Sequence, residues 1–435
     1  MIQPIGETLA NVSWAALDGA AREKLKCCVL ANFSVAVAGV PYVRLPEPVP
    51  SSSGHFLFNG RRTAAARDAA FYNAAAMHAR TQDDFDPIGK LHSATVVMPA
   101  ALAAAERVDA SGEALLDAFA VGYAACTGMS RAFSPRTNPK GLRATGLYTP
   151  FGAAAAVGRM AGLDARGLAN AIAIAASLTG GLTQCWVDGS DEWQLHAAAA
   201  ASNGLLAVDL TRHGVRGAAH ALDGQAGFYR ALADCTPRFE DVAADFDADR
   251  AILETVIKRY PVSGICQPIV QLSERLASKA AADPARIERV TIAMNPAEMR
   301  YPGTLNKGPF RSFSDVLMSA AFCCASVLVN RGFAFGDLFD LGRADRNRLI
   351  AATDVRDDAA LPPLSCRIEL QLAGGAMLSD TLLDGGAELA SDWASLDAWA
   401  AALWREAGRP DYTHFRDAVS ELDRISATAL IDTLS

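Results

Sequence analysis

The chain has 435 residues, of which 51% are hydrophobic and 20% are charged, so it can bury large cores and does not have the composition of a disordered protein. This length is typical of two or three domains. The formal net charge of −8 and the lack of a Lys/Arg block argue against nucleic acid as a partner.

Targeting and membrane signals are weak throughout the sequence. The first residues, MIQPIGETLANVSW, contain no basic stretch followed by an apolar core, so we expect no signal peptide. Apolar runs such as Val316 to Val329 are interrupted by polar residues and are too short to span a bilayer. The nine cysteines form no Cys-x-x-Cys pair, and Cys27-Cys28 and Cys323-Cys324 lie in apolar runs. We therefore expect reduced core thiols in a cytoplasmic protein with no membrane partner.

The first part of the chain has helical patterning. An apolar stripe runs from Ser13 to Gly39, and the Pro- and Gly-rich stretch from Pro41 to Gly60 follows as an irregular connection. Runs rich in Ala and Leu predict further helices at Arg62–His78, Ala100–Val108, Gly112–Phe133, Gly152–Gly162, Ala165–Leu182 and Leu195–His213. Small residues on the helix faces, as in Ala153 to Ala156, allow close approach and predict a compact bundle.

The pattern changes after about Lys258. The stretches RVTIAM (289–294) and CRIELQL (366–372) alternate polar and apolar residues, as half-buried strands do. Gly374-Gly375 then predicts a hairpin turn into a strand at Met377–Leu382. Helical runs lie between the strands, at Gln267–Ala281 and Ser314–Gly332.

Helical patterning returns at Asp392, in Trp393–Ala407 and Phe415–Leu434. We expect the C-terminal helices to pack back on the first domain. The prediction is therefore a mainly α protein with a large all-helical domain, residues 1–257 completed by 392–435, and a smaller α+β domain, residues 258–391.

The stretch MHARTQDDFDPIGKLHSATVVMP, residues 77–99, carries the densest chemistry. His78, Asp83, Asp84, Asp86, Lys90 and His92 fall within fifteen residues between two helix-prone runs. A loop held by a rigid scaffold is where catalytic groups tend to collect. The alternative is a solvated loop whose Asp residues cap the next helix. No His-x-x-x-His or Cys/His spacing indicates a metal site, so we expect no metal.

Several stretches resemble the MmgE/PrpD family, in the family's order along the chain. They are WAALDGAAREKLKCCVLANFSVAVAG, FYNAAAMHARTQDDFD with LHSATVVMPAALAAAE, SGEALLDAFAVGYAACTGMSRA, GLRATGLYTPFGAAAAVGRMAGLD, DEWQLHAAAAASNGLLAVDLTRHGVRG with LDGQAGF, and KRYPVSGICQP. The resemblance covers roughly Trp14 to Gly332. The family includes 2-methylcitrate dehydratase, cis-aconitate decarboxylase and iminodisuccinate epimerase. It implies a helical domain with a smaller α+β lid domain, a homodimer, a small polycarboxylate substrate, and no metal or organic cofactor.

The resemblance also assigns positions in the loop and after it. The family's acidic pair falls on Asp83 and Asp84, and its histidine in the "HP" motif falls on His92. The aspartate just before the pair is replaced by Thr81. The histidine of the family's G-[FW]-H-x-T motif is replaced by Arg143.

Four later positions complete the comparison. The family's lysine before Leu-His falls near Trp193, and the lysine of its K-x-[YF]-P motif is kept as Lys258. The histidine a few residues on becomes Ser263, and a tyrosine of a late helix becomes Phe322. An Asp, two His, a Lys and a Tyr of a decarboxylase-like site are thus replaced, which argues against cis-aconitate decarboxylation.

Enzymes that abstract a proton next to a carboxylate pair a base of tuned pKa with cations that hold the developing charge. Lys258 lies among apolar neighbours in IKRYP, where partial burial would lower its pKa and make it a usable base; the alternative is an ordinary surface lysine. His92 is a candidate general acid whose tautomer Asp83 or Asp84 fixes, and the alternative is a histidine that caps the following helix.

Arg143 replaces a titratable imidazole by a planar fork, which suits bidentate carboxylate binding. Tyr148, about one helical turn further on, is either a second acid/base group or a packed aromatic at a helix start. Trp193 would narrow the substrate pocket, and Thr81, Ser263 and Phe322 are the other expected substrate-binding positions. We interpret His196 and His213 as structural, and Gly180-Gly181 with the GLRATG stretch as turns for close backbone approach or anion binding.

Three functions remain open from the sequence. The first is a cofactor-independent lyase, most simply a hydro-lyase of the 2-methylcitrate dehydratase kind acting on a small di- or tricarboxylate. The second is an isomerase resembling iminodisuccinate epimerase, with proton transfer by two groups. The third is a catalytically inactive homologue that binds a carboxylate or a partner.

Overall fold

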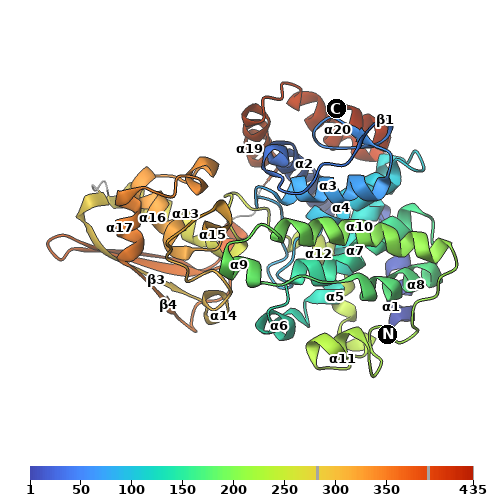
Figure 1. Cartoon of the computed structure of the whole chain (residues 1–435), viewed down its shortest axis with the longest axis horizontal. Coiled ribbons are helices and arrows are strands. Elements are labelled where there is room, and N and C mark those ends of the chain that lie inside the picture. Colours follow the sequence, from blue (N-terminus) through green and yellow to red (C-terminus); the bar gives the residue numbers. More distant parts are fainter. Residues whose placement is uncertain (281–283, 389–391, 435) are drawn as a thin grey trace. The chain divides into compact units, whose positions relative to one another are not determined.

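The computed structural model describes residues 1–280, 284–388 and 392–434. The chain divides into two compact units: Met1–Leu182, Glu192–Ile257 and Ser391–Ser435 form the first, and Thr183–Asp191 and Lys258–Ala390 form the second. The first unit is built of helices with one two-stranded ribbon, and the second contains a four-stranded sheet with helices (Figure 1). The fold is thus mainly α with a small α+β unit, as the sequence predicts.

One segment belongs to a different unit from the one that the sequence suggested. Thr183–Asp191 lies within the expected helical domain, yet it joins the second unit. Its short helix α9 (Gln184–Asp188) is followed by Gly189, whose carbonyl accepts a hydrogen bond of 3.0 Å from Ser312 Oγ. These contacts are long-range, so local patterning could not show them. Two predicted boundary residues, Ala281 and Ser391, lie outside the described residues.

Helix α4 is the centre of the helical unit. The long helices of this unit are α1 (Ile2–Ala10), α2 (Gly19–Gly39), α3 (Ala66–His78), α4 (Ser93–Ala105), α5 (Gly112–Ser130), α7 (Ala144–Met160), α8 (Ala165–Ala175) and α10 (Trp193–Arg212). Every residue of α4 is buried, and it packs against α3, α5, α7 and α10 (Figure 1). A helix that is apolar on all sides belongs in a core.

Two helices begin earlier than the sequence predicted. Helix α4 starts at Ser93 and not at Ala100, and α7 starts at Ala144 and not at Gly152. Each contains a proline, Pro99 and Pro150 respectively. Proline disfavours a helix interior, but burial of the whole helix surface outweighs the local preference here.

The stretch from Pro41 to Gly60 is not irregular throughout. It contains β1 (Pro50–Phe56), which pairs antiparallel with β2 (Arg62–Thr63). Helix α3 therefore begins at Ala66 and not at Arg62. Strand β1 is mostly exposed and rich in serine, so its sequence lacks the alternation that marks a half-buried strand.

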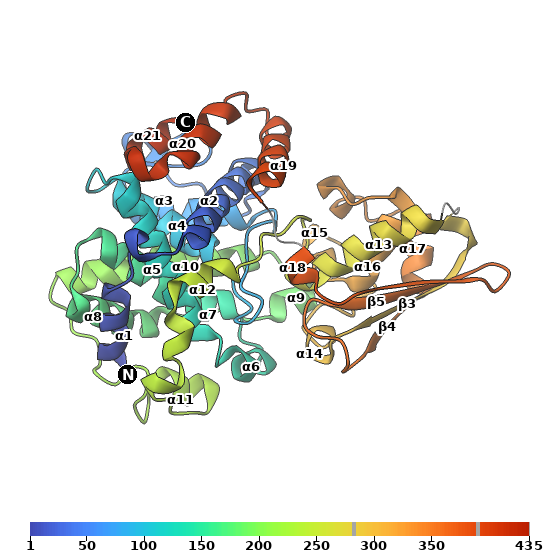
Figure 2. The same cartoon turned by 180° about the vertical axis from the view of Figure 1, so that it is seen from behind.

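The C-terminal helices complete the helical unit. Helices α19 (Trp393–Glu406), α20 (Tyr412–Ser420) and α21 (Ala427–Asp432) lie beside α2 and α5 (Figure 2). Trp404 Nε1 donates a hydrogen bond of 3.1 Å to Ser34 Oγ of α2, and Lys26 Nζ forms an ion pair of 2.6 Å with Asp423. Among the described residues, the segment Gly19–Tyr42 is long and apolar enough to cross a membrane by length and composition, and 78% of its most apolar window is buried inside the protein. Such burial is typical of a core helix.

The second unit is a mixed sheet covered by helices. The strands are β3 (Ile287–Met294), β4 (Thr353–Asp357), β5 (Cys366–Leu372) and β6 (Met377–Leu382), in the order β4-β3-β5-β6. β5 and β6 form the predicted hairpin, whereas β4, which pairs parallel with β3, was not predicted. Helices α13 (Gln267–Ala280), α16 (Ala320–Asn330) and α17 (Ala344–Ala351) pack against the sheet (Figures 1 and 2).

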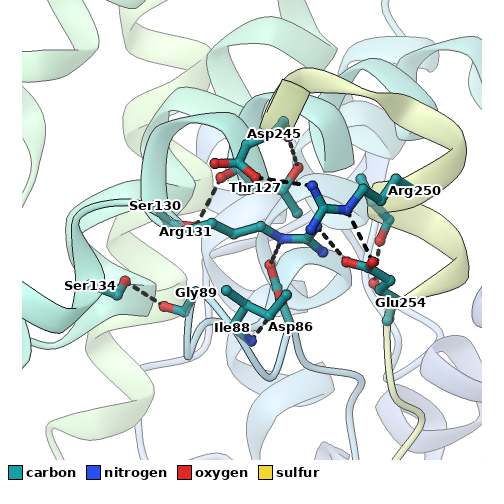
Figure 3. Close-up of polar contacts among 12 residues, drawn as sticks. Asp86, Ile88, Gly89, Thr127, Ser130, Arg131, Ser134, Asp245, Arg250 and Glu254 are labelled. Atoms are coloured by element: carbon teal, nitrogen blue, oxygen red, sulfur yellow. Dashed lines mark hydrogen bonds and ion pairs between the residues drawn. The ribbon is translucent and has the colours of Figure 1, made fainter. Parts of the chain in front are cut away.

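A buried ion pair holds the loop between α3 and α4 in place. Arg131, at the end of α5, donates from Nε to Asp86 Oδ2 at 2.8 Å, and both side chains are almost completely buried (Figure 3). Asp86 Oδ1 accepts from the backbone N–H of Ile88, and Ser134 Oγ donates to the carbonyl of Gly89 at 2.6 Å. The loop is therefore fixed to the scaffold by its own polar groups.

The same arginine reaches toward the protein surface. Arg131 Nη1 lies 2.6 Å from Glu254 Oε2, and the Glu254 side chain is 39% exposed. Arg250 also binds Glu254, at 3.0 Å (Figure 3). Because solvent screens an exposed carboxylate, Glu254 should matter much less than Asp86 for stability.

We expect Arg131→Ala to destabilise the protein by about 3–5 kcal/mol, because it leaves the Asp86 carboxylate buried without a counter-charge. The matched control is Glu254→Ala, for which we expect a loss of about 0–1 kcal/mol. The measurement is the free energy of unfolding from urea titration. Equal losses for the two variants would contradict the proposed anchoring of the loop.

Candidate functional site

The buried carboxylate of Asp83 collects three donors at one oxygen. His78 Nδ1 and His92 Nδ1 each lie 2.9 Å from Asp83 Oδ2, and Thr95 Oγ1 donates to the same atom at 2.6 Å. His78 is the last residue of α3, His92 precedes α4, and Thr95 lies in the first turn of α4. The loop between the two helices thus brings both imidazoles to one carboxylate.

The neighbouring Asp84 has a different role. Its Oδ1 accepts from the backbone N–H of Ala94 at 3.1 Å, and its Oδ2 accepts from the Tyr123 hydroxyl. Its own backbone N–H donates to Asn32 Oδ1 at 2.9 Å. Asp84 therefore caps α4 from the loop, where the helix N-terminus favours negative charge. The helix-capping interpretation of the loop aspartates describes Asp84, whereas Asp83 binds the imidazoles.

His92 is oriented by two acceptors. Its Nδ1 lies 2.9 Å from Asp83 Oδ2 and 2.9 Å from the carbonyl oxygen of Asp84. A carbonyl and a carboxylate can only accept, so Nδ1 carries a hydrogen. His92 occupies the N-cap position of α4, but its side chain makes no capping hydrogen bond. The helix-capping interpretation of His92 therefore does not apply.

Arg143 lies in the same cluster at the start of α7. Its Nη2 is 2.6 Å from His78 Nε2, its Nη1 is 3.1 Å from His196 Nδ1, and Nη1 also donates to the carbonyl of Trp193. The arginine is 3% exposed. Its own backbone N–H donates to Gly181 at 3.0 Å.

The backbone around Arg143 depends on glycine. A side chain at Gly146 would overlap the carbonyl oxygen of Gly180, and the Gly180 N–H donates to the Gly146 carbonyl at 3.0 Å. Gly180-Gly181 and the GLRATG stretch are therefore a close backbone approach, one of the two interpretations offered by the sequence. This contact fixes the start of α7 and with it the position of the Arg143 side chain.

Two histidines of the cluster are held neutral. Burial lowers the pKa of His78 to about 3; the Asp83 carboxylate opposes this shift, and the Arg143 guanidinium adds to it. Burial, followed by the charge of Arg143, lowers the pKa of His196 to about 3. Trp193 is buried and meets the His78 ring edge to face, with 5.0 Å between ring centroids.

Sequence reasoning gave no role to three members of this cluster. His78 lies in the singled-out stretch without an assigned function, Thr95 was not considered, and His196 was interpreted as structural. His92 and Thr95 are three residues apart at the start of α4, and this helical spacing could have indicated that both side chains face the same loop. Trp193 and His196 are three residues apart and thus share one face of α10. This spacing could have indicated that both residues meet the same neighbour, which in the structure is Arg143.

Two other predicted residues of the helical unit have different surroundings. The Tyr148 hydroxyl lies 2.9 Å from Thr137 Oγ1, the ring packs against Phe228, and burial raises the pKa of Tyr148. This favours the packed-aromatic interpretation. Thr81 has a positive φ of 54°, which is strained for a β-branched residue, and its buried hydroxyl has no hydrogen-bond partner among the described residues. Such strain often accompanies function.

The remaining predicted residues belong to the second unit. Lys258 is 1% exposed, so it is not an ordinary surface lysine. The Ser263 hydroxyl is buried and has no hydrogen-bond partner among the described residues. Phe322 is buried under the guanidinium of Arg346, which lies 4.5 Å from its ring centroid. An aromatic ring thus holds a buried cation where the resemblance has a tyrosine.

Comparison with known proteins identifies the family. The family model of the MmgE/PrpD N-terminal domain matches residues 3–239. The chain belongs to the MmgE/PrpD family.

Two relatives of the MmgE/PrpD protein carry similar names. The chain is 26% identical over 303 residues to the cis-aconitate decarboxylase-like protein oryM of Aspergillus oryzae, and this match covers 65% of the chain and 62% of the relative. The chain is also 29% identical over 237 residues to human cis-aconitate decarboxylase, and this match covers 53% of the chain and 44% of the relative. The matched segment thus spans less than two thirds of either relative.

The family match covers part of the predicted site. Asp83, His92 and Arg143 lie inside the matched residues 3–239 of this MmgE/PrpD protein, whereas Lys258 lies beyond them. The geometry of the Asp83 cluster therefore belongs to the segment for which family membership is shown.

The cluster also has the donor set of a metal site. The ligand atoms of His78, Asp83 and His92 lie within 4.8 Å of one another, an arrangement that the sequence spacing did not suggest. These residues could hold a divalent ion, but the Arg143 guanidinium in contact with His78 disfavours a second cation there. The absence of a metal requirement in this MmgE/PrpD protein stays a prediction.

We expect Asp84 to make the stability of the protein depend on pH. Burial raises the pKa of Asp84 from 3.8 to about 6, so the folded state holds a proton that the unfolded state has released between these values. The corresponding stabilisation is complete below pH 4 and is lost as the pH rises through 6, a change of about 3 kcal/mol.

The matched variant is Asp84→Asn, which keeps the shape but cannot ionise. The measurement is the free energy of unfolding at several pH values between 4 and 7 for both proteins. We expect the difference between them to change over this range, with the parent protein losing stability relative to the variant as the pH rises. Parallel curves would show that folding does not change the pKa of Asp84.

Proposed function

We propose that the protein is a cofactor-independent acid–base enzyme that acts next to a carboxylate of a small di- or tricarboxylate, most simply as a hydro-lyase of the 2-methylcitrate dehydratase kind. The observation that carries this proposal is the contact of His92 Nδ1 with Asp83, which directs Nε2 to proton exchange. An imidazole oriented by a buried carboxylate is a common general acid or base.

The proposed elimination needs two proton transfers. A base removes the hydrogen on the carbon next to the carboxylate, and an acid protonates the leaving hydroxyl on the neighbouring carbon, so that an alkene and water are formed. We assign the acid to His92 in its imidazolium form, which gives its Nε2 proton to the leaving hydroxyl while Nδ1–H stays on Asp83, and the base to Lys258 in its neutral amine form, which takes the proton from carbon. The burial of Lys258 supports a functional role for this lysine.

The substrate-binding part of the proposal rests on the resemblance and on burial. Thr81, Arg143 and Trp193 are buried in the helical unit, and Arg143 is a cation next to the Asp83 cluster. The names of the two relatives refer to a tricarboxylate and to a lyase reaction, which supports carboxylate chemistry without fixing the reaction of this chain. The homodimer, the cytoplasmic location and the absence of nucleic-acid and membrane partners stay predictions.

The reaction can be tested with a small panel of substrates in D2O. Incubation with 2-methylcitrate or citrate should produce a conjugated alkene, which is followed by its ultraviolet absorbance, while NMR follows deuterium at the α-carbon. Deuterium incorporation without an alkene would indicate an epimerase and would contradict the lyase. Binding of the carboxylates without either change would indicate an inactive homologue.

We expect His92→Gln and Lys258→Ala each to lower kcat by about 10²–10⁴-fold, because each removes one proton-transfer group. Substrate affinity, measured by calorimetry, should change little. The matched control is His213→Gln. His213 is exposed, and its ring contacts the carbonyl of Asp209, four residues earlier. Normal turnover of the His92 variant would remove this residue from the mechanism.

A further inference from the structure

The guanidinium of Arg143 lies between two imidazoles. His78 Nε2 is 2.6 Å from Nη2, and His196 Nδ1 is 3.1 Å from Nη1. An arginine has five N–H donors and no acceptor, and it stays charged at all pH values of interest. Each ring nitrogen that faces Arg143 at these distances must therefore accept, and so it cannot carry a hydrogen.

This constraint settles the hydrogen positions on both rings. His78 has its other nitrogen, Nδ1, on Asp83 Oδ2 at 2.9 Å, so the hydrogen lies on Nδ1. His196 accepts at Nδ1, so its hydrogen lies on Nε2. The two rings are thus neutral imidazoles of opposite tautomer. A second proton on either ring would place an N–H donor against an N–H donor of Arg143, and a charged imidazolium against the charged guanidinium.

The groups around the two rings support this assignment. His78 faces Asp83, His92 and Arg143, and of these only Asp83 favours a charged imidazole. The Asp83 oxygen already accepts from Thr95 and lies 2.9 Å from His92 Nδ1, so its attraction is shared among several donors. His196 lines an open depression of about 370 Å³ together with Glu192, and it bonds to Arg143 on its inner side.

We propose that Arg143 is a positioning residue that locks His78 and His196 as neutral imidazoles of opposite tautomer, so that His92 alone in this cluster exchanges protons. The consequence for catalysis rests on the proposed function, whereas the lock itself is a property of the ligand-free protein. A carboxylate clamp, the role that the sequence suggested for Arg143, would use guanidinium N–H groups that face a substrate, whereas the lock uses those that face the two imidazoles.

The test is long-range 1H–15N NMR of the full chain labelled at its histidine rings, with each signal assigned by a single His→Gln variant. The chain has seven histidines, which keeps the spectrum simple. In the ligand-free protein we expect His78 as the Nδ1–H tautomer and His196 as the Nε2–H tautomer, both unchanged between pH 5.5 and 8. A doubly protonated His78 or His196 at pH 5.5 to 6, or the opposite tautomer on either ring, would overturn the proposal.

Variants at position 143 separate a lock from a passive contact. In Arg143→Met the His196 Nδ1 loses its donor, so we expect the His196 signals to move toward a mixture of the two tautomers, while Asp83 keeps the hydrogen of His78 on Nδ1. Arg143→Lys keeps a cation that can only donate, and it should retain the parent tautomer on the ring that it contacts. Unchanged His196 signals in Arg143→Met would show that Arg143 does not set the tautomer of this ring.

Two controls complete the experiment. Thr95→Val removes a donor from Asp83 without touching Arg143, and we expect it to leave the His78 and His196 tautomers as they are. His213, which bonds to Asp209 of its own helix, is the internal reference that should not change in any variant. Because no substrate is present, failure of the lock is seen in these spectra, and failure of the proposed function is seen in the D2O experiment.

Discussion

The loop between α3 and α4 is organised around one buried oxygen, Asp83 Oδ2, and the donors that face it. A carboxylate cannot be taken out of water without donors that replace its hydration, and here the donors come from the end of α3, the residue before α4 and the first turn of α4. This requirement brings His78 and His92 together across the loop. The N-terminus of α4 adds favourable charge, and Asp84 makes direct use of it.

A second layer of contacts keeps the loop from relaxing around that oxygen. Asp86 is paired with Arg131 from α5, and Ser134 binds the loop backbone at Gly89 (Figure 3). The loop backbone is also hydrogen-bonded to Asn32 of α2. Because these partners are themselves buried, the loop has few alternative positions. A rigid scaffold of this kind is what precise proton transfer requires.

Most of the long helices could be predicted from the sequence because their patterns are local, but α1 and several helix boundaries could not. Pro99 and Pro150 lie inside helices whose surfaces are buried on all sides, so tertiary packing outweighed the local signal. Strands β1 and β4 were missed for a different reason. β1 is mostly exposed and β4 is only partly buried, so the alternation that marks a half-buried strand is lacking in both. The hairpin of β5 and β6, with its glycine turn and clear alternation, was predicted with its exact bounds.

The sequence indicated the loop that carries the candidate site, but it did not indicate how the side chains are arranged there. Clustered Asp and His residues between two helices marked the loop. Sequence alone could not tell which of two adjacent aspartates faces the imidazoles, because Asp83 and Asp84 differ only in the direction that the folded loop gives them. The role of His196 depends on Arg143, which lies 53 positions earlier in the sequence and reaches it only through helix packing. The same packing places the guanidinium of Arg143 against His78, His196 and the carbonyl of Trp193. A single sequence motif around Arg143 could not show these contacts.

The central claim is that the Asp83 cluster presents His92 Nε2 to a small carboxylate, and a crystal of the full chain soaked with citrate tests it most directly. The account predicts that a carboxylate or hydroxyl oxygen of citrate lies within hydrogen-bond distance of His92 Nε2, while Nδ1 stays on Asp83. Citrate bound elsewhere, with His92 Nε2 in contact with protein only, or a His92 ring turned away from Asp83, would contradict it.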